Sequence, residues 1–311
     1  MKPAKKVTII VAAALIVVGF MISLGALNSM GFDFKKLNTV NYETNTYMID
    51  EAFTNISVES DACDVRLLLS DDGSCKVICN ESDEVSHSVT VQNHTLLIDS
   101  KDKRKWYEHI GFYFGNYGKM EVEIYLPQSE YESLYILGIS GDIIVPDDFS
   151  FSDAKIRNTS GDVSFQGSVK NDLSVKTVSG DLYVKDANPK NLDVKSTSGT
   201  IQLTDIECQK ASSETTSGEI IFSNLIASEN IYIESVSGDV QLYVSDSNYL
   251  WIKTVSGDVS GSLLSEKIFK TETISGDIRV PKTTGEGECE IKTTSGDVDI
   301  TYNLKYNDGI D

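Results

Sequence analysis

Apolar and polar side chains alternate with a period of two through residues 134–303, and a Ser-Gly pair interrupts the alternation at regular intervals. An acid or a threonine follows each pair, and the pair returns every 19 or 20 residues. The nine serines are Ser140, Ser160, Ser179, Ser198, Ser217, Ser237, Ser256, Ser275 and Ser295. A fixed period of this length predicts a solenoid in which each repeat forms one coil. The alternation predicts two short strands per coil, joined at the Ser-Gly corner.

The interior of the predicted solenoid is defined by four apolar positions in each coil. They stand six and four residues before the Ser and three and five residues after it, as in Leu173, Val175, Leu182 and Val184. A small polar residue two before the Ser, such as Thr177, is also expected to face inward and to form a hydroxyl ladder between coils. The predicted fold is all-β, a parallel β-solenoid of about nine coils over residues 134–303.

Residues 46–133 lack the corner motif and are predicted to form an N-terminal β cap, because an uncovered first coil would expose a strand edge. The expected strands are Phe53–Glu59, Asp64–Leu69, Cys75–Cys79, Ser88–Gln92, Thr95–Asp99 and Met120–Leu126. The residues Asp71-Asp72-Gly73-Ser74 predict a hairpin turn that brings Cys63 toward Cys79. These two cysteines form a disulfide there or remain buried free thiols.

A membrane helix is predicted at residues 7–27, which contain no charged residue and are long enough to cross a bilayer. Lys2, Lys5 and Lys6 precede them and favour a cytoplasmic N-terminus. The expected order is a cytoplasmic tail (1–6), a single transmembrane helix (7–27), a juxtamembrane tether (28–45), the extracellular cap and solenoid, and a C-terminal tail (304–311). The alternative is a cleaved signal peptide, whose apolar region is normally shorter.

The corners and the residues before them resemble one bacterial family. Leu126-Pro127, then Tyr131, Leu134 and Ile136, lead into Ser140-Gly141-Asp142-Ile143 and eight further corners. This is similar to a β-strand-repeat family of unknown function often labelled "putative adhesin", whose anchored, LiaG-like members are associated with cell-envelope stress regulators. The resemblance covers roughly residues 46–303 and implies the fold and an envelope location, without residue roles. Thr200 and Glu219 depart from the usual corner Asp.

The corner acids are expected to stack about 5 Å apart, so that their like charges need compensation. The structural interpretation is that they cap the turns and lie near the Lys and Arg side chains three residues before the Ser. The alternative is a ladder that binds Ca²⁺, which prefers carboxylate oxygens. The candidates for this ladder are Asp162, Asp181, Asp239, Asp258, Asp277 and Asp297.

The segment Lys105–Lys119 contains six aromatic residues interleaved with glycines. They are Trp106, Tyr107, Phe112, Tyr113, Phe114 and Tyr117. Aromatic rings on a loop stack on sugars or anchor a partner, and they also serve as lids over a core. We expect this loop either to cover the first coil or to present a recognition surface.

Little else in the sequence points to chemistry. His87, His94 and His109 lack the spacing of metal ligands and are interpreted as surface or half-buried side chains. We expect no catalytic, cofactor or metal residues. The net charge of −20 opposes nucleic-acid binding. The sequence predicts a non-catalytic envelope protein in the cell membrane that binds or senses a wall polymer, a cation or a membrane protein partner. The alternative is a β-helical enzyme acting on envelope polysaccharide.

Overall fold

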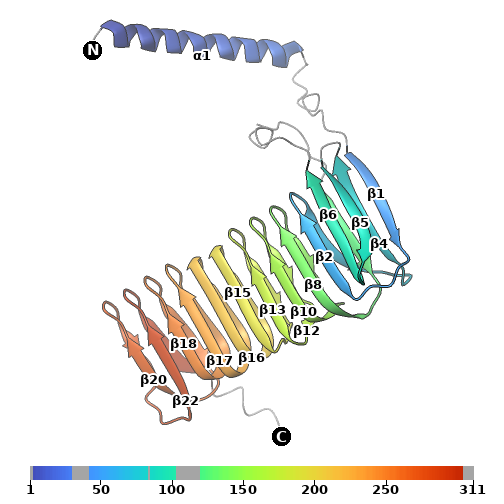
Figure 1. Cartoon of the computed structure of the whole chain (residues 1–311). Coiled ribbons are helices and arrows are strands. Elements are labelled where there is room, and N and C mark those ends of the chain that lie inside the picture. The colour runs from blue at the N-terminus through green and yellow to red at the C-terminus, as the bar shows by residue number, and fades with distance from the viewer. Residues whose placement is uncertain (1–2, 30–41, 83–84, 103–119, 304–311) are drawn as a thin grey trace.

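The computed structural model describes residues 3–29, 42–82, 85–102 and 120–303. Parallel strands stack into an elongated all-β solenoid of about eight turns (Figure 1). Its N-terminal end is built from β1 (Tyr42–Ile49), β2 (Asn55–Ser60), β3 (Asp64–Leu69), β4 (Cys75–Ser82), β5 (Val85–Gln92), β6 (Thr95–Asp102) and β7 (Glu121–Leu126).

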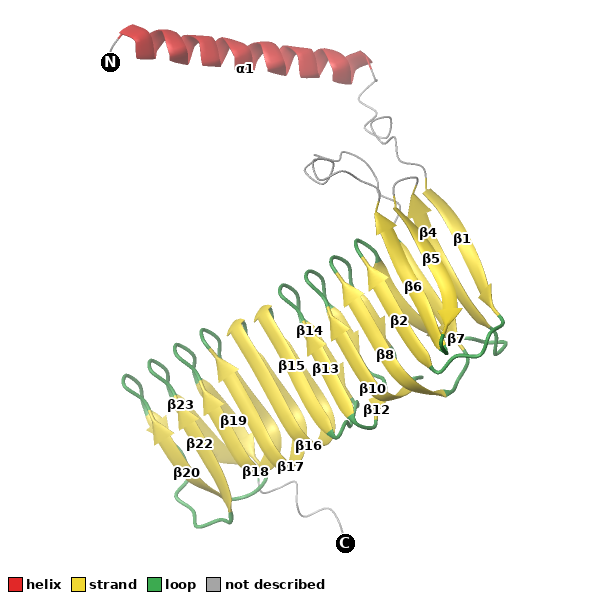
Figure 2. Cartoon of the chain, viewed as in Figure 1, coloured by secondary structure: helices red, strands yellow, loops and turns green. Residues whose placement is uncertain are grey.

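The repeat region contributes the remaining strands, which lie on two faces joined at the corners (Figure 2). They are β8 (Glu130–Gly138), β9 (Ile143–Val145), β10 (Ser150–Arg157), β11 (Val163–Phe165), β12 (Ser168–Val169), β13 (Asp172–Lys176), β14 (Leu182–Lys185), β15 (Asn191–Ser198), β16 (Ile201–Ser217), β17 (Ile220–Ser235), β18 (Val240–Lys253), β19 (Val259–Leu263), β20 (Lys267–Glu272), β21 (Ile278–Arg279), β22 (Gly287–Lys292) and β23 (Val298–Tyr302). We call the face before the corners, which contains β2, β8, β10, β13 and β15, the first face. The face after the corners, which contains β3, β9, β11 and β14, is the second face.

The core lies between the two faces and follows the predicted pattern. Leu173 and Val175 on β13, and Leu182 and Val184 on β14, are buried. Equivalent residues pair in register from coil to coil, as Leu173 does with Leu192. The period-two alternation therefore places one apolar column above another along the whole stack.

Glycine is required at the corners by both conformation and stacking. Gly161 has a φ of 108°, which residues with a Cβ rarely adopt. A Cβ on Gly161 would also lie 2.3 Å from the carbonyl oxygen of Gly141 in the neighbouring coil. The corners can therefore stack closely only because each carries no side chain at this position.

The small polar residues before the corners face inward, but the expected hydroxyl ladder between coils is wrong. Thr177 and Ser235 are buried. Their hydroxyls donate within their own corners, to the carbonyls of Ser179 at 3.3 Å and Gly238 at 3.0 Å. Among the described residues, the hydroxyls of Thr215 and Thr254 have no hydrogen-bond partner.

The coils at the C-terminal end are not stacked in chain order. Strand β22 pairs with β18 on one side and β20 on the other, and β23 lies between β19 and β21. The Ser295 coil is therefore inserted between those of Ser256 and Ser275. The Ser275 coil forms the outer edge, and its β21 contains two residues, both exposed. The solenoid has about eight turns, whereas the sequence predicts about nine coils stacked in chain order.

Parallel stacking also extends into the segment expected to be a separate cap. Strand β2 pairs with β8 in the register of the repeats, with Ile56 opposite Leu134, and on its other side it pairs with β6. Val65 on β3 lies opposite Ile143. This register places Cys63 where the later corners have Gly, so the signature is absent although the coil is present.

The hairpin expected at residues 71–74 is wrong, because β7 lies between β3 and β4. Strand β4 runs antiparallel to β7 and to β1, and β5 runs antiparallel to β6. The turn itself is present: Asp72 accepts the backbone N–H of Ser74 at 2.9 Å, and Gly73 has a φ of 73°.

Helix α1 spans Pro3–Ser29 and begins within the expected tail. Among the described side chains of α1, eight large apolar ones are exposed: Leu15, Ile16, Val17, Val18, Phe20, Met21, Ile22 and Leu24. In the part of the chain that the structure describes, no helix combines the length and hydropathy needed for a membrane span. The transmembrane helix expected at residues 7–27 is therefore not confirmed.

Candidate functional site

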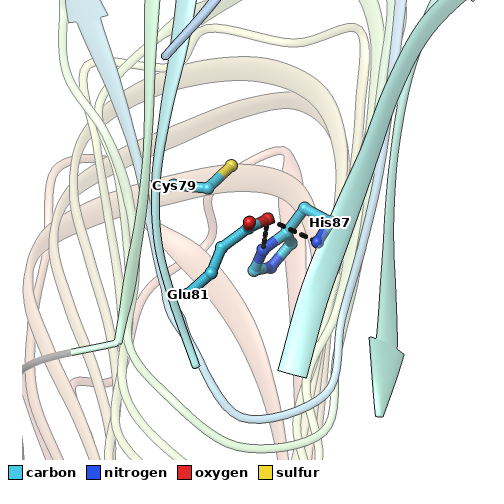
Figure 3. Close-up of side chains that lie close together, drawn as sticks. All are labelled: Cys79, Glu81 and His87. Atoms are coloured by element: carbon cyan, nitrogen blue, oxygen red, sulfur yellow. Dashed lines mark hydrogen bonds and ion pairs between the residues drawn. The ribbon is translucent and has the colours of Figure 1, made fainter. Parts of the chain in front are cut away.

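Three side chains with metal-ligating atoms converge at the N-terminal end of the core. Cys79 and Glu81 alternate inward from β4, and His87 points toward them from β5 (Figure 3). One ligand atom from each lies within 4.8 Å of the others, and all three residues are buried. Figure 3 shows the Glu81 carboxylate between the thiol and the imidazole. The cluster lies between β4, which pairs with β7 and β1, and β5, which pairs with β6.

The Glu81 carboxylate is surrounded by hydrogen-bond donors. Its Oε1 accepts the backbone N–H of His87 at 2.5 Å and lies 3.0 Å from Nδ1 of the same residue. The Tyr47 hydroxyl donates to Oε1 at 3.5 Å, and Nδ2 of Asn45 donates to Oε2 at 2.5 Å. Burial lowers the pKa of His87, and the nearby Glu81 opposes that shift only in part. The imidazole and the carboxylate are in direct contact through Nδ1 and Oε1.

Cys63 lies on the other side of the imidazole, with Sγ 3.7 Å from Nε2 of His87. Both Cys63 and Cys79 are free and buried, so the Cys63–Cys79 disulfide considered from the sequence is absent. Burial raises the pKa of Cys63 to about 11, and that of Cys79 to about 12 with a further contribution from Glu81. In the absence of a cation both thiols are protonated at neutral pH.

The order thiol, imidazole, carboxylate in Cys63, His87 and Glu81 is that of a cysteine nucleophile with its base. Such a nucleophile must meet its substrate, and it needs a lowered thiol pKa. Cys63 is 2% exposed and its pKa is raised. The arrangement is therefore unsuited to acyl transfer.

The sequence contained one usable sign of this cluster. Cys79 and Glu81 are two residues apart on a predicted strand, so both point to the same face. His87, which we interpreted as surface or half-buried, is buried, whereas His94 is exposed in the turn between β5 and β6. His109 lies outside the described residues. Nothing in the spacing shows that Cys63, 24 residues before His87, contacts the imidazole.

The corner acids are joined to backbone groups of the neighbouring coils. Oδ1 of Asp162 accepts the N–H of Asp181 at 2.8 Å, and Oδ1 of Asp181 accepts that of Thr200 at 2.8 Å. The same bond links the other acids of the candidate ladder: Asp239 accepts from Asp258, Asp258 from Asp297, and Asp297 from Asp277. One oxygen of each accepting carboxylate thus has a structural role.

The aromatic loop at Lys105–Lys119 lies outside the described residues, so Trp106, Tyr107, Phe112, Tyr113, Phe114 and Tyr117 remain a prediction. The structure instead reveals an aromatic patch on the outer side of the first face, formed by Tyr232, Tyr249 and Trp251. The ring of Tyr232 lies 6.0 Å from that of Tyr249 and 6.3 Å from that of Trp251. Tyr232 is 41% exposed, and the other two rings are half-buried.

A shallow groove crosses the same face over β8, β10 and β13. Its volume is about 490 Å³, and its lining includes Tyr135, Lys155, Arg157 and Lys176. Asp153 and Asp172 also line it. The groove is therefore a site with cationic and aromatic side chains on a strongly acidic chain.

Known proteins share this architecture. The family model "Toastrack DUF4097" matches residues 53–274 and 226–311. A solved structure of a "Putative lipid binding protein" from Parabacteroides distasonis superposes with a TM-score of 0.53 at 18% identity, over 84% of this chain and 97% of that chain. A "putative adhesin" from Parabacteroides merdae gives 0.50 at 16% identity, over 84% of this chain and 96% of that one. Comparison with curated proteins gives no match.

These identities establish a shared fold and no more. The family match, by contrast, covers most of the chain and includes both the corner repeats and the strands before them. The chain belongs to the Toastrack DUF4097 family.

Proposed function

We propose that this protein is a non-catalytic binding protein of the cell envelope, whose first face recognises an extended wall polymer. The observation that carries the proposal is the aromatic patch of Tyr232, Tyr249 and Trp251. Partly exposed rings on neighbouring strands are suited to stacking on sugar rings, because each presents an apolar face and a polar edge. The names of the two solved relatives, an adhesin and a lipid-binding protein, also concern binding rather than turnover.

The patch is held in place by its surroundings. The Tyr249 hydroxyl donates to Oε2 of Glu290 on β22 at 3.0 Å, and Tyr232 lies opposite Trp251 in the β17–β18 pairing. Parallel strands with matched register cannot shift relative to one another without disturbing the core. A rigid platform of this kind loses little conformational entropy when it binds a ligand.

The groove over β8, β10 and β13 supplies a second contact area on the same face. Lys155, Arg157 and Lys176 would attract phosphate or carboxylate groups, although Asp193 also pairs with Lys176 at 2.6 Å. A polymer lying along the stack would meet basic side chains toward the N-terminal end and aromatic rings toward the C-terminal end. This arrangement favours a polymer that carries both sugars and anions.

Attachment to the cell membrane through α1, with the solenoid outside the cell, is part of the proposal. It rests on the uncharged residues 7–27 and the lysines before them, and on the exposed apolar side chains of α1. Exposed apolar surface of this extent requires a partner, for which a bilayer or another membrane helix is suitable. A polysaccharide-cleaving enzyme is the alternative, and it would need paired acids in an open site.

Co-sedimentation of the purified full chain with isolated cell walls tests the proposal. We expect binding by the wild type, a loss of at least tenfold in affinity for Tyr232→Ala and Trp251→Ala, and no newly released reducing ends. Tyr243→Ala is the matched control, because Tyr243 is 49% exposed on the second-face part of β18. Equal binding by all variants would overturn the assignment of the patch, and released sugar ends would favour the enzyme.

A further inference from the structure

The cluster of Cys79, Glu81 and His87 buries a carboxyl group, and among the described residues no Lys or Arg pairs with it. Glu81 points inward from β4, on the same side of the strand as the apolar side chain of Val77. Its hydrogen-bond partners are Asn45, Tyr47 and His87. Hydrogen bonds offset part of the cost of burying a charge, and a cation would offset the remainder.

We propose that Cys79, Glu81 and His87 bind a thiophilic divalent cation, for which Zn²⁺ fits the donor set. Thiolate, imidazole and carboxylate are the three side-chain ligands that zinc uses. Hard cations such as Ca²⁺ and Mg²⁺ take oxygen ligands only and would not select a thiol. This inference is independent of polymer binding, because the cluster is buried at the N-terminal end of the core.

Binding of a zinc ion at this cluster would require movement of side chains but not of the backbone. The three ligand atoms lie within 4.8 Å of one another, whereas neighbouring ligands around tetrahedral zinc are about 3.4–3.6 Å apart. Rotation of the Cys79 and Glu81 side chains, both on β4, would bring them to that spacing. A thiolate and a carboxylate together neutralise the charge of the ion. Binding therefore releases one proton, from the Cys79 thiol.

Two neighbouring side chains are placed to orient the ligands. Asn45 donates to Oε2 of Glu81, which leaves Oε1 directed toward His87. If Nδ1 of His87 binds the metal, its proton moves to Nε2, where Sγ of Cys63 lies 3.7 Å away as an acceptor. Hydrogen bonds of this kind fix the tautomer and the ring orientation of a metal-bound histidine.

Titration of the reduced, untagged full chain with Co²⁺ tests the site, since a thiolate ligand gives a charge-transfer absorption that oxygen and nitrogen ligands do not. We expect one equivalent with this band, displaced by Zn²⁺. Cys79→Ser should lose the band, and Cys63→Ser should bind about 10–100-fold more weakly. Cys75→Ser is the matched control, because Cys75 is buried on the same face of β4 outside the cluster and should bind as the wild type does.

A second measurement needs no variant and stands even if Cys79→Ser does not fold. The wild-type chain is alkylated at a denaturant concentration that opens the thiols slowly, with Zn²⁺ or with chelator, and each cysteine is read by mass spectrometry. We expect Zn²⁺ to slow alkylation of Cys79 at least tenfold more than that of Cys208 and Cys289, which are distant in the solenoid. Uniform protection, or no thiolate band in the wild type, would overturn the proposal.

Discussion

Oδ1 of Asp162 accepts the backbone N–H of Asp181, the equivalent residue one coil further on, at a distance of 2.8 Å. The same relationship begins at Asp64, which accepts from Asp142 at 2.9 Å, and continues through Asp142 to Asp162. Each acid thus uses the peptide group of the next coil as a partner. Hydrogen bonds from backbone N–H groups to these carboxylates offset part of the repulsion between the stacked acids.

Replacement of Asp162 tests the structural role of this column. Asp162→Ala removes the acceptor for the Asp181 N–H, so we expect the free energy of unfolding to fall by about 1–2 kcal/mol in urea denaturation. Asp162→Asn keeps an oxygen at this position and should cost less. Asp148→Ala, at an exposed acid away from the corners, should change stability by less than about 0.5 kcal/mol. Equal losses for Asp162→Ala and Asp162→Asn would show that charge, rather than the acceptor, is what matters.

Calcium should have little effect on the solenoid. One oxygen of Asp162, Asp181, Asp239, Asp258 and Asp297 is already bonded to a backbone N–H. A cation would therefore have to compete with the corner for these oxygens. We expect the melting temperature of the full chain to be the same in Ca²⁺ and in chelator, as measured by circular dichroism. A rise in Ca²⁺ that Asp162→Asn reduces would instead establish the cation ladder considered from the sequence.

Alanine substitutions at two glycines distinguish the free-energy cost of backbone strain from the cost of steric overlap between coils. Gly161 and Gly73 both have positive φ angles. A Cβ on Gly161 would overlap the carbonyl of Gly141, whereas a Cβ on Gly73 would have no neighbouring atom within 4 Å. We expect Gly73→Ala to cost about 1–2 kcal/mol through backbone strain alone. Gly161→Ala should cost more, because the coils must also move apart. Equal costs in denaturant titrations would mean that the corner accommodates a methyl group without separation.

The sequence was sufficient to predict the individual coil but not the order of all coils. The alternation around Leu173 and Leu182 and the spacing of the corners determine which side chains point inward. The corners at Ser275 and Ser295 carry the same signature, so the pattern does not say which one stacks on Ser256. Contacts between distant residues decide this, including the bond from Tyr249 to Glu290 and the pairing of Leu250 with Cys289.

The candidate site was less predictable for a similar reason. Cys79 and Glu81 share a face because they are two residues apart on one strand. Their proximity to His87 depends on the placement of two strands that the sequence does not specify: β4 pairs between β7 and β1, and β5 pairs with β6. The aromatic patch likewise combines Tyr232 with residues of the next coil. Neither arrangement has a local sequence signature.

A buried ion pair holds the reordered C-terminal end. Nζ of Lys267 lies 2.6 Å from Oδ1 of Asp246, and the lysine side chain is 3% exposed. Lys267→Met leaves Asp246 without its counter-ion, so we expect a loss of about 3–5 kcal/mol. The double variant Lys267→Met, Asp246→Leu should regain most of the lost stability, because it leaves no unpaired buried charge. Both are measured by chemical denaturation with two probes, to detect separate unfolding of this end.

An exposed pair in the same region provides the control. Nζ of Lys270 lies 3.0 Å from Glu288, with the two side chains 57% and 45% exposed. Solvent screens this pair, so Lys270→Met should cost less than about 1 kcal/mol. If Lys270→Met and Lys267→Met lowered the free energy of unfolding equally, burial would not be the reason for the larger loss expected at Lys267.

The buried thiol of Cys289 should make the folded chain sensitive to alkali. Burial raises its pKa from the ordinary 9.0 to about 12, an effect that Lys267 only partly opposes. Between these pH values the unfolded chain has released the proton while the folded chain retains it, so stability falls as pH rises through this range. The contribution of this thiol is up to about 1.4 kcal/mol per pH unit. Cys289→Ala lowers stability at pH 7 by creating a cavity, yet its stability should decline less steeply between pH 9 and pH 11. Parallel declines for the two proteins in urea denaturation would show that this thiol does not contribute.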